Sequence, residues 1–166
     1  MPNWCMNSLQ ITASKENIEI LAKKLDECGG KDFFDIFVPN AAQAGQDENW
    51  YAYNGNTYGC KWNCTANDWD VEDGDGTTIT ISFDSPWGPP IALYDLIDVQ
   101  EGFSVAAGYY EPGMCFVGEY VDGNDDYYDY TDRNSETIYG SVPGEIVDRW
   151  GIYEQMVECE EENNEE

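Results

Sequence analysis

The order of strand-like and helix-like segments limits the fold of this 166-residue chain more than any other feature. Residues 4–13 alternate apolar and polar side chains, and residues 77–83 (TTITISF) do the same with β-branched residues, as β-strands do. Between them, residues 14–28 repeat apolar side chains at helical spacing, after a serine suited to an N-cap and before two glycines. These segments predict a strand, a helix and a second strand.

Further elements fill in the order. After a polar loop over residues 40–57, residues 57–73 indicate one or two strands, and residues 91–97 indicate a helix. Residues 102–110 and 114–121 predict a hairpin. The resulting order, strand-helix-strand-strand-helix-strand, is typical of a split βαβ unit. We therefore expect an α+β protein, a ferredoxin-like sandwich whose antiparallel sheet carries two helices on one face.

The chain beyond residue 121 adds a C-terminal extension. A chain of this length holds one domain with a sizeable core and is short for two, so we expect a single domain over residues 1–157 with a β/α extension from about residue 122. The extension contains strand candidates at 127–132 and 136–142, a short helix over 144–157 broken near Gly151, and an acidic tail at 158–166 that we expect to be disordered.

Four segments carry a family resemblance: MPNWCMNSLQITA (1–13), YGCKWN (58–63), FDSPWGPP (83–90) and YYEPGMCFVGEY (109–120). In this order they resemble motifs of the YubB-like ferredoxin-like proteins of bacteriophages and plasmids. The resemblance implies a ferredoxin-like fold and a mobile-element origin, but no established chemistry. The chain departs from the family pattern at Asn63, where an aspartate is common, in its acidity and in the segment after residue 121.

The net charge of −27 is placed unevenly along the chain. Residues 1–31 hold four acidic and four basic residues, whereas residues 32–166 hold 30 acidic residues against Lys61, Arg133 and Arg149. DNA, RNA and anionic membranes bind cationic surfaces, so direct binding to them is disfavoured. A basic partner, a cation or a solvating role remains. Solubility needs a net charge of only about 2 to 8, so the excess favours a basic partner.

Catalytic motifs are scarce. The chain has no histidine, no Gly-x-Ser-x-Gly nucleophile elbow and no Gly-x-x-x-x-Gly-Lys phosphate loop. Chance pairs of carboxylates are inevitable among 34 acidic residues, so no particular pair indicates a hydrolase. Lys61 and Glu111 are charged residues within the four segments, and we expect them to pair at a sheet edge rather than to catalyse. We expect no enzyme, no catalytic residue and no cofactor.

Metal-binding patterns are also weak. Read as an EF-hand loop, residues 122–133 place Tyr127 where glycine is required and Arg133 where glutamate belongs. The six cysteines lack the spacing of a zinc site. Cys60 and Cys64 lie four residues apart on an expected strand, too far from each other to bridge. We expect no metal site, with calcium bound by another kind of loop left as an alternative.

Aromatic residues are prominent in the four motifs. They have two interpretations: packing together under the helices, which we favour, or an open pocket for a base or a sugar. The five residues concerned are Trp4, Trp62, Trp87, Tyr109 and Phe116.

Acidic side chains recur at regular spacing in two segments. Asp68, Asp70 and Glu72 alternate, so on a strand they point to one face about 6.6 to 6.8 Å apart. Two steps of a DNA strand advance the phosphates by about the same distance. Residues 122–132 extend the array and add tyrosines, which offer flat contact area. The predicted partner-binding residues are Asp68, Asp70, Glu72, Asp73, Asp75, Asp122, Asp125, Asp126, Tyr127, Tyr128, Asp129 and Asp132.

This array predicts a non-enzymatic DNA mimic, encoded by a phage or plasmid, that blocks a basic nucleic-acid-binding protein of the host. The target would be a restriction, CRISPR or chromosome-organising factor whose cationic groove the mimic occupies. The alternatives are a small-ligand or calcium-binding module, and a carboxylate-based hydrolase. The first ten residues do not resemble a secretory signal, and no apolar run approaches the roughly 20 residues of a membrane span. We therefore expect a soluble protein of the host cytoplasm.

Overall fold

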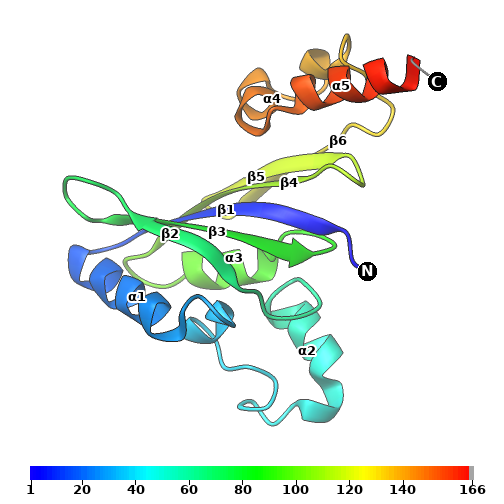
Figure 1. The fold of residues 1–166 in the computed structure, drawn as a ribbon. Coiled ribbons are helices and arrows are strands. Elements are labelled where there is room, and N and C mark those ends of the chain that lie inside the picture. Colours follow the sequence, from blue (N-terminus) through cyan, green and yellow to red (C-terminus); the bar gives the residue numbers. More distant parts are fainter. Residues whose placement is uncertain (165–166) are drawn as a thin grey trace.

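The computed structural model describes residues 1–164 and shows an α+β protein arranged in three layers (Figure 1). The middle layer is one antiparallel sheet of six strands in the order β2-β3-β1-β4-β5-β6. The strands are β1 (Trp4–Thr12), β2 (Ala66–Val71), β3 (Thr78–Pro86), β4 (Ser104–Glu111), β5 (Phe116–Val121) and β6 (Asn124–Asp129).

Helices lie on both faces of the sheet (Figure 1). One face packs against α1 and α3, with α2 beyond them, and the opposite face carries α4 and α5. The helices are α1 (Lys15–Cys28), α2 (Trp50–Thr57), α3 (Ile91–Asp98), α4 (Gly144–Trp150) and α5 (Ile152–Asn164), with 3-10 turns at Phe33–Ile36, Asp47–Asn49 and Ile138–Gly140.

Alternation along the strands builds two hydrophobic cores. On β1, Leu9 and Ile11 are fully buried against α1 and α3, because every second side chain points to that face. On β4 and β5, Tyr110 and Val117 point the other way and contact the apolar side chains of α4 and α5. Helices therefore cover most of one face, except at β6, and only part of the other.

The expected elements of the first 121 residues are largely confirmed. α1 begins after Ser14, whose Oγ accepts a hydrogen bond from the Asn17 amide at 3.2 Å, and it ends at Gly29 in the left-handed conformation. β3, α3 and the β4–β5 hairpin form where they were predicted. The expected loop over residues 40–57 was wrong in part, since it contains α2. This helix has no apolar face for a sequence pattern to reveal.

The strand expected to begin near residue 57 begins only at Ala66. Cys60 and Cys64 therefore lie in a loop, not on a strand. Both thiols donate to the Trp62 carbonyl oxygen, at 3.3 and 3.7 Å, and both side chains are buried. The preceding Gly59 has a φ of +84°, which turns the chain away from an extended course.

Two expectations for the C-terminal extension were wrong. Residues 136–142 form no strand, because Ile138 and Val142 are four residues apart and enter the same core as a helical turn does. Residues 158–164 continue helix α5 instead of forming a disordered tail, while residues 165–166 of that tail lie outside the described residues. Glu160 holds this helix in place by accepting hydrogen bonds from the amide and hydroxyl of Ser135, at 2.9 and 2.7 Å. The predicted break at Gly151 is confirmed.

No helix within residues 1–164 combines the length and the hydropathy that crossing a bilayer requires.

Candidate partner-binding face

The sheet face that carries α4 and α5 stays open over β1, β3 and β2. Apart from Trp4, its side chains there are short or polar, and most are exposed. We call this surface the open face and define it by Trp4, Ser8, Gln10, Thr12, Asp68, Asp70, Thr78, Thr80, Ser82 and Asp84.

One row of directly opposed residues crosses the sheet from edge to edge on this side. It carries a carboxylate at the β2 edge, three small residues in the middle and two carboxylates at the β6 edge. Five strand spacings of about 4.8 Å give the row a length of about 24 Å. Its members, in order, are Asp68, Ser82, Ser8, Gly108, Glu119 and Asp126.

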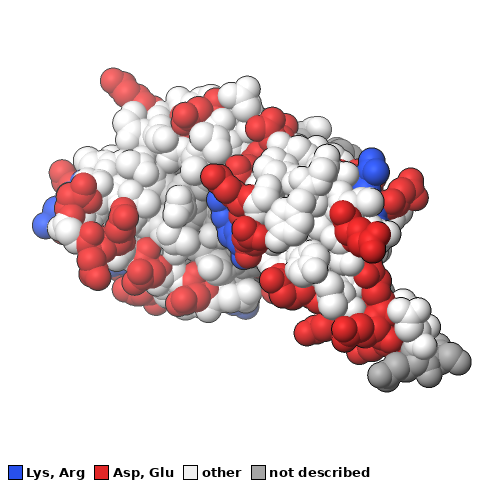
Figure 2. All heavy atoms as spheres, turned by 90° about the horizontal axis from the view of Figure 1, so that it is seen from above, with Lys and Arg blue, Asp and Glu red and all other residues white. Residues whose placement is uncertain are grey.

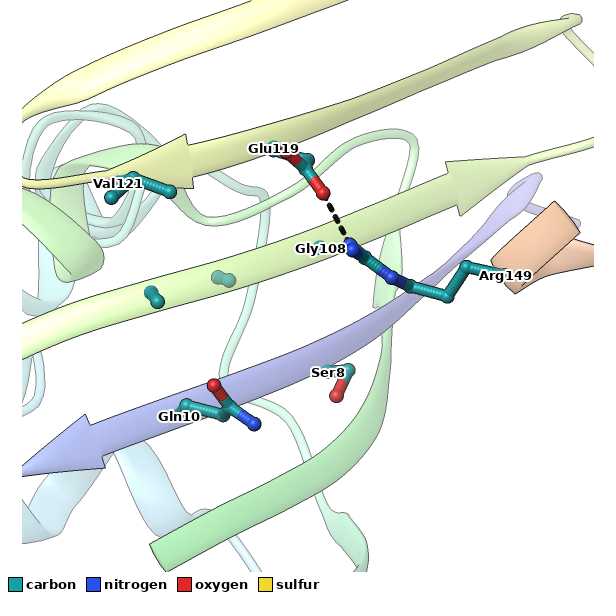
Figure 3. Close-up of a pocket in the computed structure, with 8 residues that line it drawn as sticks. Ser8, Gln10, Gly108, Glu119, Val121 and Arg149 are labelled. Atoms are coloured by element: carbon teal, nitrogen blue, oxygen red, sulfur yellow. Dashed lines mark hydrogen bonds and ion pairs between the residues drawn. The ribbon is translucent and has the colours of Figure 1, made fainter. Parts of the chain in front are cut away.

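A hollow of about 400 Å³ lies in the middle of this row, beside α4 (Figure 3). Arg149 reaches from the end of α4 across Gly108 and forms an ion pair with Glu119. A Cβ atom on Gly108 would lie 3.7 Å from the guanidinium, at ordinary van der Waals distance, so the Arg149 side chain lies directly over this position. The hollow therefore contains a cation whose charge is already balanced.

A second hollow, of about 300 Å³, lies at the other end of the open face. Trp4 and Trp62 line it with their rings edge to face, 6.3 Å between centroids and at 67°. Asp84 lines it as well, and its Oδ2 accepts a hydrogen bond from Asn67 Nδ2 at 3.3 Å. We call this site the Trp4–Trp62 pocket; its lining residues are Trp4, Trp62, Asn63, Thr65, Asn67 and Asp84.

The favoured interpretation of the five motif aromatics was wrong for Trp4 and Trp87. Tyr109 and Phe116 are buried as expected, together with Cys5. Trp4 and Trp87, in contrast, are 47% and 52% exposed. Trp87 also has a φ of +70°, uncommon for a bulky residue, and its amide donates to the Asn3 carbonyl at 2.8 Å. The open aromatic alternative therefore describes this end of the sheet better.

The expected pairing of Lys61 with Glu111 was also wrong. The Lys61 ammonium lies 5.3 Å from the centroid of the Trp62 ring, a cation–π contact. Glu111 is buried and accepts hydrogen bonds from the Gly113 and Met114 amides, which close the β4–β5 turn. Each residue therefore stabilises its own local structure.

The structure separates the predicted acidic array into two parts. Asp68 and Asp70 lie exposed on the open face at the β2 edge of the sheet, and their side chains share that face as predicted. Glu72, Asp73 and Asp75 follow in the exposed segment that turns into β3. Thr77 donates to Asp75 through its amide and hydroxyl, and these hydrogen bonds lower the pKa of that carboxyl.

The other predicted residues lie at the β6 edge, five strands away, and they alternate between the two faces. Asp126 and Tyr128 lie on the α4–α5 side, opposite Glu119 and Val117. Asp125, Tyr127 and Asp129 lie on the α1–α3 side, Asp122 is in the β5–β6 turn, and Asp132 follows the strand.

Two aspartates on the α1–α3 side of β6 already have partners within the chain. Asp125 accepts a 2.6 Å hydrogen bond from the hydroxyl of Tyr109. Burial, followed by this bond, raises the pKa of Tyr109. Asp129 accepts hydrogen bonds from Thr131, which lower the pKa of its carboxyl. The acids of residues 122–132 therefore do not form one array with those of β2.

Seen from above, acidic side chains are spread over this side of the molecule, at its rim and beside basic side chains near its centre, with uncharged surface between them (Figure 2). The open face also carries Asp84, and the row across the sheet includes Glu119, which the sequence interpretation did not select. A signal for Asp84 was present, because it continues the outward alternation of Thr78, Thr80 and Ser82.

No group of three or more cysteine, aspartate and glutamate side chains within residues 1–164 is arranged to hold a metal ion.

Comparison with known proteins identifies no family for this chain. No family model and no curated protein matches the chain. Among solved structures, it is similar to the protein api92 from Yersinia pseudotuberculosis, described with the family model DUF1281. The match has 21% identity and a TM-score of 0.35, and it covers 48% of this chain and 29% of that chain. A likeness of this size supports no conclusion about function.

Proposed function

We propose that the protein is a non-enzymatic DNA mimic that binds a basic, nucleic-acid-binding protein through the open face and, beyond α4 and α5, through Asp126 at the β6 edge of the same side. The observation that carries the proposal is the row across the sheet, which presents Asp68 at one end and Asp126 at the other. Its one overlying cation, Arg149, is neutralised by Glu119. A partner with cationic walls would find carboxylates on both sides of a neutral centre, as it does with the two phosphate strands of a duplex.

The charge of the whole chain supports the same partner class. Two ion pairs, Lys23–Glu27 and Arg149–Glu119, are the only ones within residues 1–164, so most carboxylates have no cation near them. Such a surface attracts a cationic protein over a Debye length and accelerates its association. It repels nucleic acid for the same reason.

The proposal also includes a ferredoxin-like fold and a mobile-element origin for the protein. The strand order β2-β3-β1-β4 around α1 and α3 supports a ferredoxin-like unit, to which β5, β6, α4 and α5 are added. The four motifs support membership in the YubB-like family and a mobile-element origin, and hence a host defence or chromosome-organising protein as the target. The site of action would be the host cytoplasm.

The experiment is capture from a nuclease-treated bacterial lysate on the immobilised protein, eluted by increasing sodium chloride. The proposal predicts nucleic-acid-binding proteins among those captured, and their release by competing duplex DNA. The dissociation constant of a purified captured protein should rise steeply with salt.

A pair of matched variants separates the open face from net charge. D68N/D70N removes two carboxylates from the open face, and D47N/E48Q removes two exposed ones ahead of α2 on the opposite side of the molecule. D68N/D70N should weaken binding about tenfold or more, the value of a lost charged hydrogen bond, and D47N/E48Q should have little effect. Capture that DNA does not compete away, or equal losses in both variants, would contradict the proposal.

A further inference from the structure

The Trp4–Trp62 pocket combines flat aromatic surface with an unneutralised carboxylate. Trp4 is 47% exposed, so its ring is available to a ligand. Asp84 has no lysine or arginine within 4.0 Å in the described part of the chain, and its only neighbour by hydrogen bond is the uncharged Asn67. These groups converge on a space of about 300 Å³, the lower end of the range for ligand sites.

The chemistry of these groups selects a cation. Indole rings attract cations to their faces, and Trp62 already receives the Lys61 ammonium in this way. Lys61 lines the neighbouring hollow with Tyr51 and Trp87 and does not line the Trp4–Trp62 pocket. Asp84 can accept two parallel hydrogen bonds from a planar donor. Thr65 and Asn67 add polar atoms at the same wall.

Among cations, the guanidinium of arginine matches this set best. It is planar, it stacks on aromatic rings, and its donors are spaced for a carboxylate, whereas a lysine ammonium is a strongly hydrated point charge. Proteins that bind nucleic acid use arginine for phosphate and guanine contacts. The pocket opens on the same face as Asp68, at the end of the sheet where β1 begins and β3 ends.

We infer that the Trp4–Trp62 pocket receives an arginine side chain of the basic partner, stacked on tryptophan and paired with Asp84. The inference rests on the proposed function and identifies the Trp4–Trp62 pocket as the site that binds one specific side chain of the partner. The remaining acids of the face would then steer the partner, while this pocket would distinguish arginine from lysine.

The test uses two short peptides of equal length and charge, one of alternating arginine and glycine and one of alternating lysine and glycine. Calorimetry measures affinity, and NMR follows the indole N–H signals, with the Trp4 signal assigned from its loss in W4L. The wild-type protein should bind the arginine peptide at least about threefold more tightly, with shifts in the Trp4 and Trp62 signals.

The decisive comparison is D84N against D47N, since each removes one exposed carboxylate. D84N should weaken binding of the arginine peptide about tenfold or more and remove most of its advantage over the lysine peptide, whereas D47N should change little. W4L should also remove the preference for arginine. Circular dichroism checks that each variant is folded.

Other outcomes overturn the inference. Equal affinity for the two peptides, or equal losses in D84N and D47N, would mean that only overall charge acts. Shifts of the Trp4 and Trp62 signals with glucose or a nucleoside, and none with the arginine peptide, would identify a different ligand class. If the captured lysate partner depends on Asp68 and Asp70 but not on Asp84, the proposed function stands and the pocket assignment fails. If capture fails as well, both fail.

Discussion

Tyr94 on α3 donates a 2.9 Å hydrogen bond from its hydroxyl to Oδ1 of Asn7 on β1, in the interior of the protein. The Asn7 amide continues the network by donating to Ser85 Oγ at 2.8 Å, and Ser85 donates to the Gly88 carbonyl at 2.6 Å. These bonds tie the loop that carries Trp87 to the middle of the sheet. A buried polar network of this kind stabilises only while each member has its partner.

The first prediction concerns this network. Asn7→Ala should lower the free energy of unfolding by about 1 to 3 kcal/mol, because it leaves the Tyr94 hydroxyl without its acceptor and Ser85 Oγ without the amide that donates to it. Urea denaturation measures the change. Ser8→Ala, the adjacent position on the open face, should stay within about 0.5 kcal/mol of the wild type. A similar loss of unfolding free energy in both variants would contradict a specific contribution of the Asn7 network to stability.

The second prediction concerns the close approach at Gly118. A Cβ atom there would lie 2.3 Å from the Tyr109 hydroxyl oxygen and 2.5 Å from the Asp126 carbonyl oxygen. Gly118→Ala should therefore cost about 1 to 3 kcal/mol by overpacking. Gly55→Ala, in helix α2 with nothing within 4 Å of its Cβ position, should be neutral or stabilise by up to about 1 kcal/mol. Thermal unfolding of both variants tests this, and a stable Gly118→Ala would contradict it.

The third prediction concerns alkaline pH. Burial raises the pKa of Tyr58 from 10.0 to about 12, and burial raises the pKa of Tyr94 well above 10.0. The unfolded chain releases these protons near pH 10.0 while the folded chain keeps them, so the stabilisation is complete below pH 10.0 and is lost as the pH rises above it. Urea midpoints should fall between pH 10 and 12, with tyrosinate absorbance appearing together with the loss of circular dichroism. Ionisation of all tyrosines in the folded protein would contradict this.

The fourth prediction concerns salt. A net charge of −27 with two ion pairs in residues 1–164 makes repulsion the dominant electrostatic interaction. Screening should therefore raise the unfolding temperature as sodium chloride increases toward about 0.1 M, where the Debye length is about 10 Å. Choline chloride should act equally, since screening does not depend on the cation. A rise confined to calcium salts would instead indicate a specific cation site.

Periodicity in the sequence was sufficient for most of the fold. The alternation over residues 77–83 and the helical spacing over residues 14–28 predict which side chains face the core, because buried positions recur with the period of the strand or helix. Helix α2 was missed because it buries little and so has no amphipathic pattern. The turn at Ile138 was mistaken for a strand because a short apolar run is compatible with either structure.

The candidate site was only partly accessible from the sequence. The alternation of Asp68 and Asp70 correctly predicted a shared face, since strand geometry is local. Whether that face and residues 122–132 form one surface depends on strand order, and β2 and β6 occupy opposite edges of the sheet.

The sequence by itself determined the chain's charge, its α+β class and the direction in which each strand residue points, because these follow from composition and from the geometry of neighbouring residues. Tertiary structure alone decided which half of the sheet stays uncovered, where Arg149 is neutralised by Glu119, and that Trp4, Trp62 and Asp84 meet. Those relationships join residues far apart in the chain. The packing of α4 and α5 onto β4 and β5 sets the first two, and the pairing of β1 with β3 brings Trp4 near Asp84.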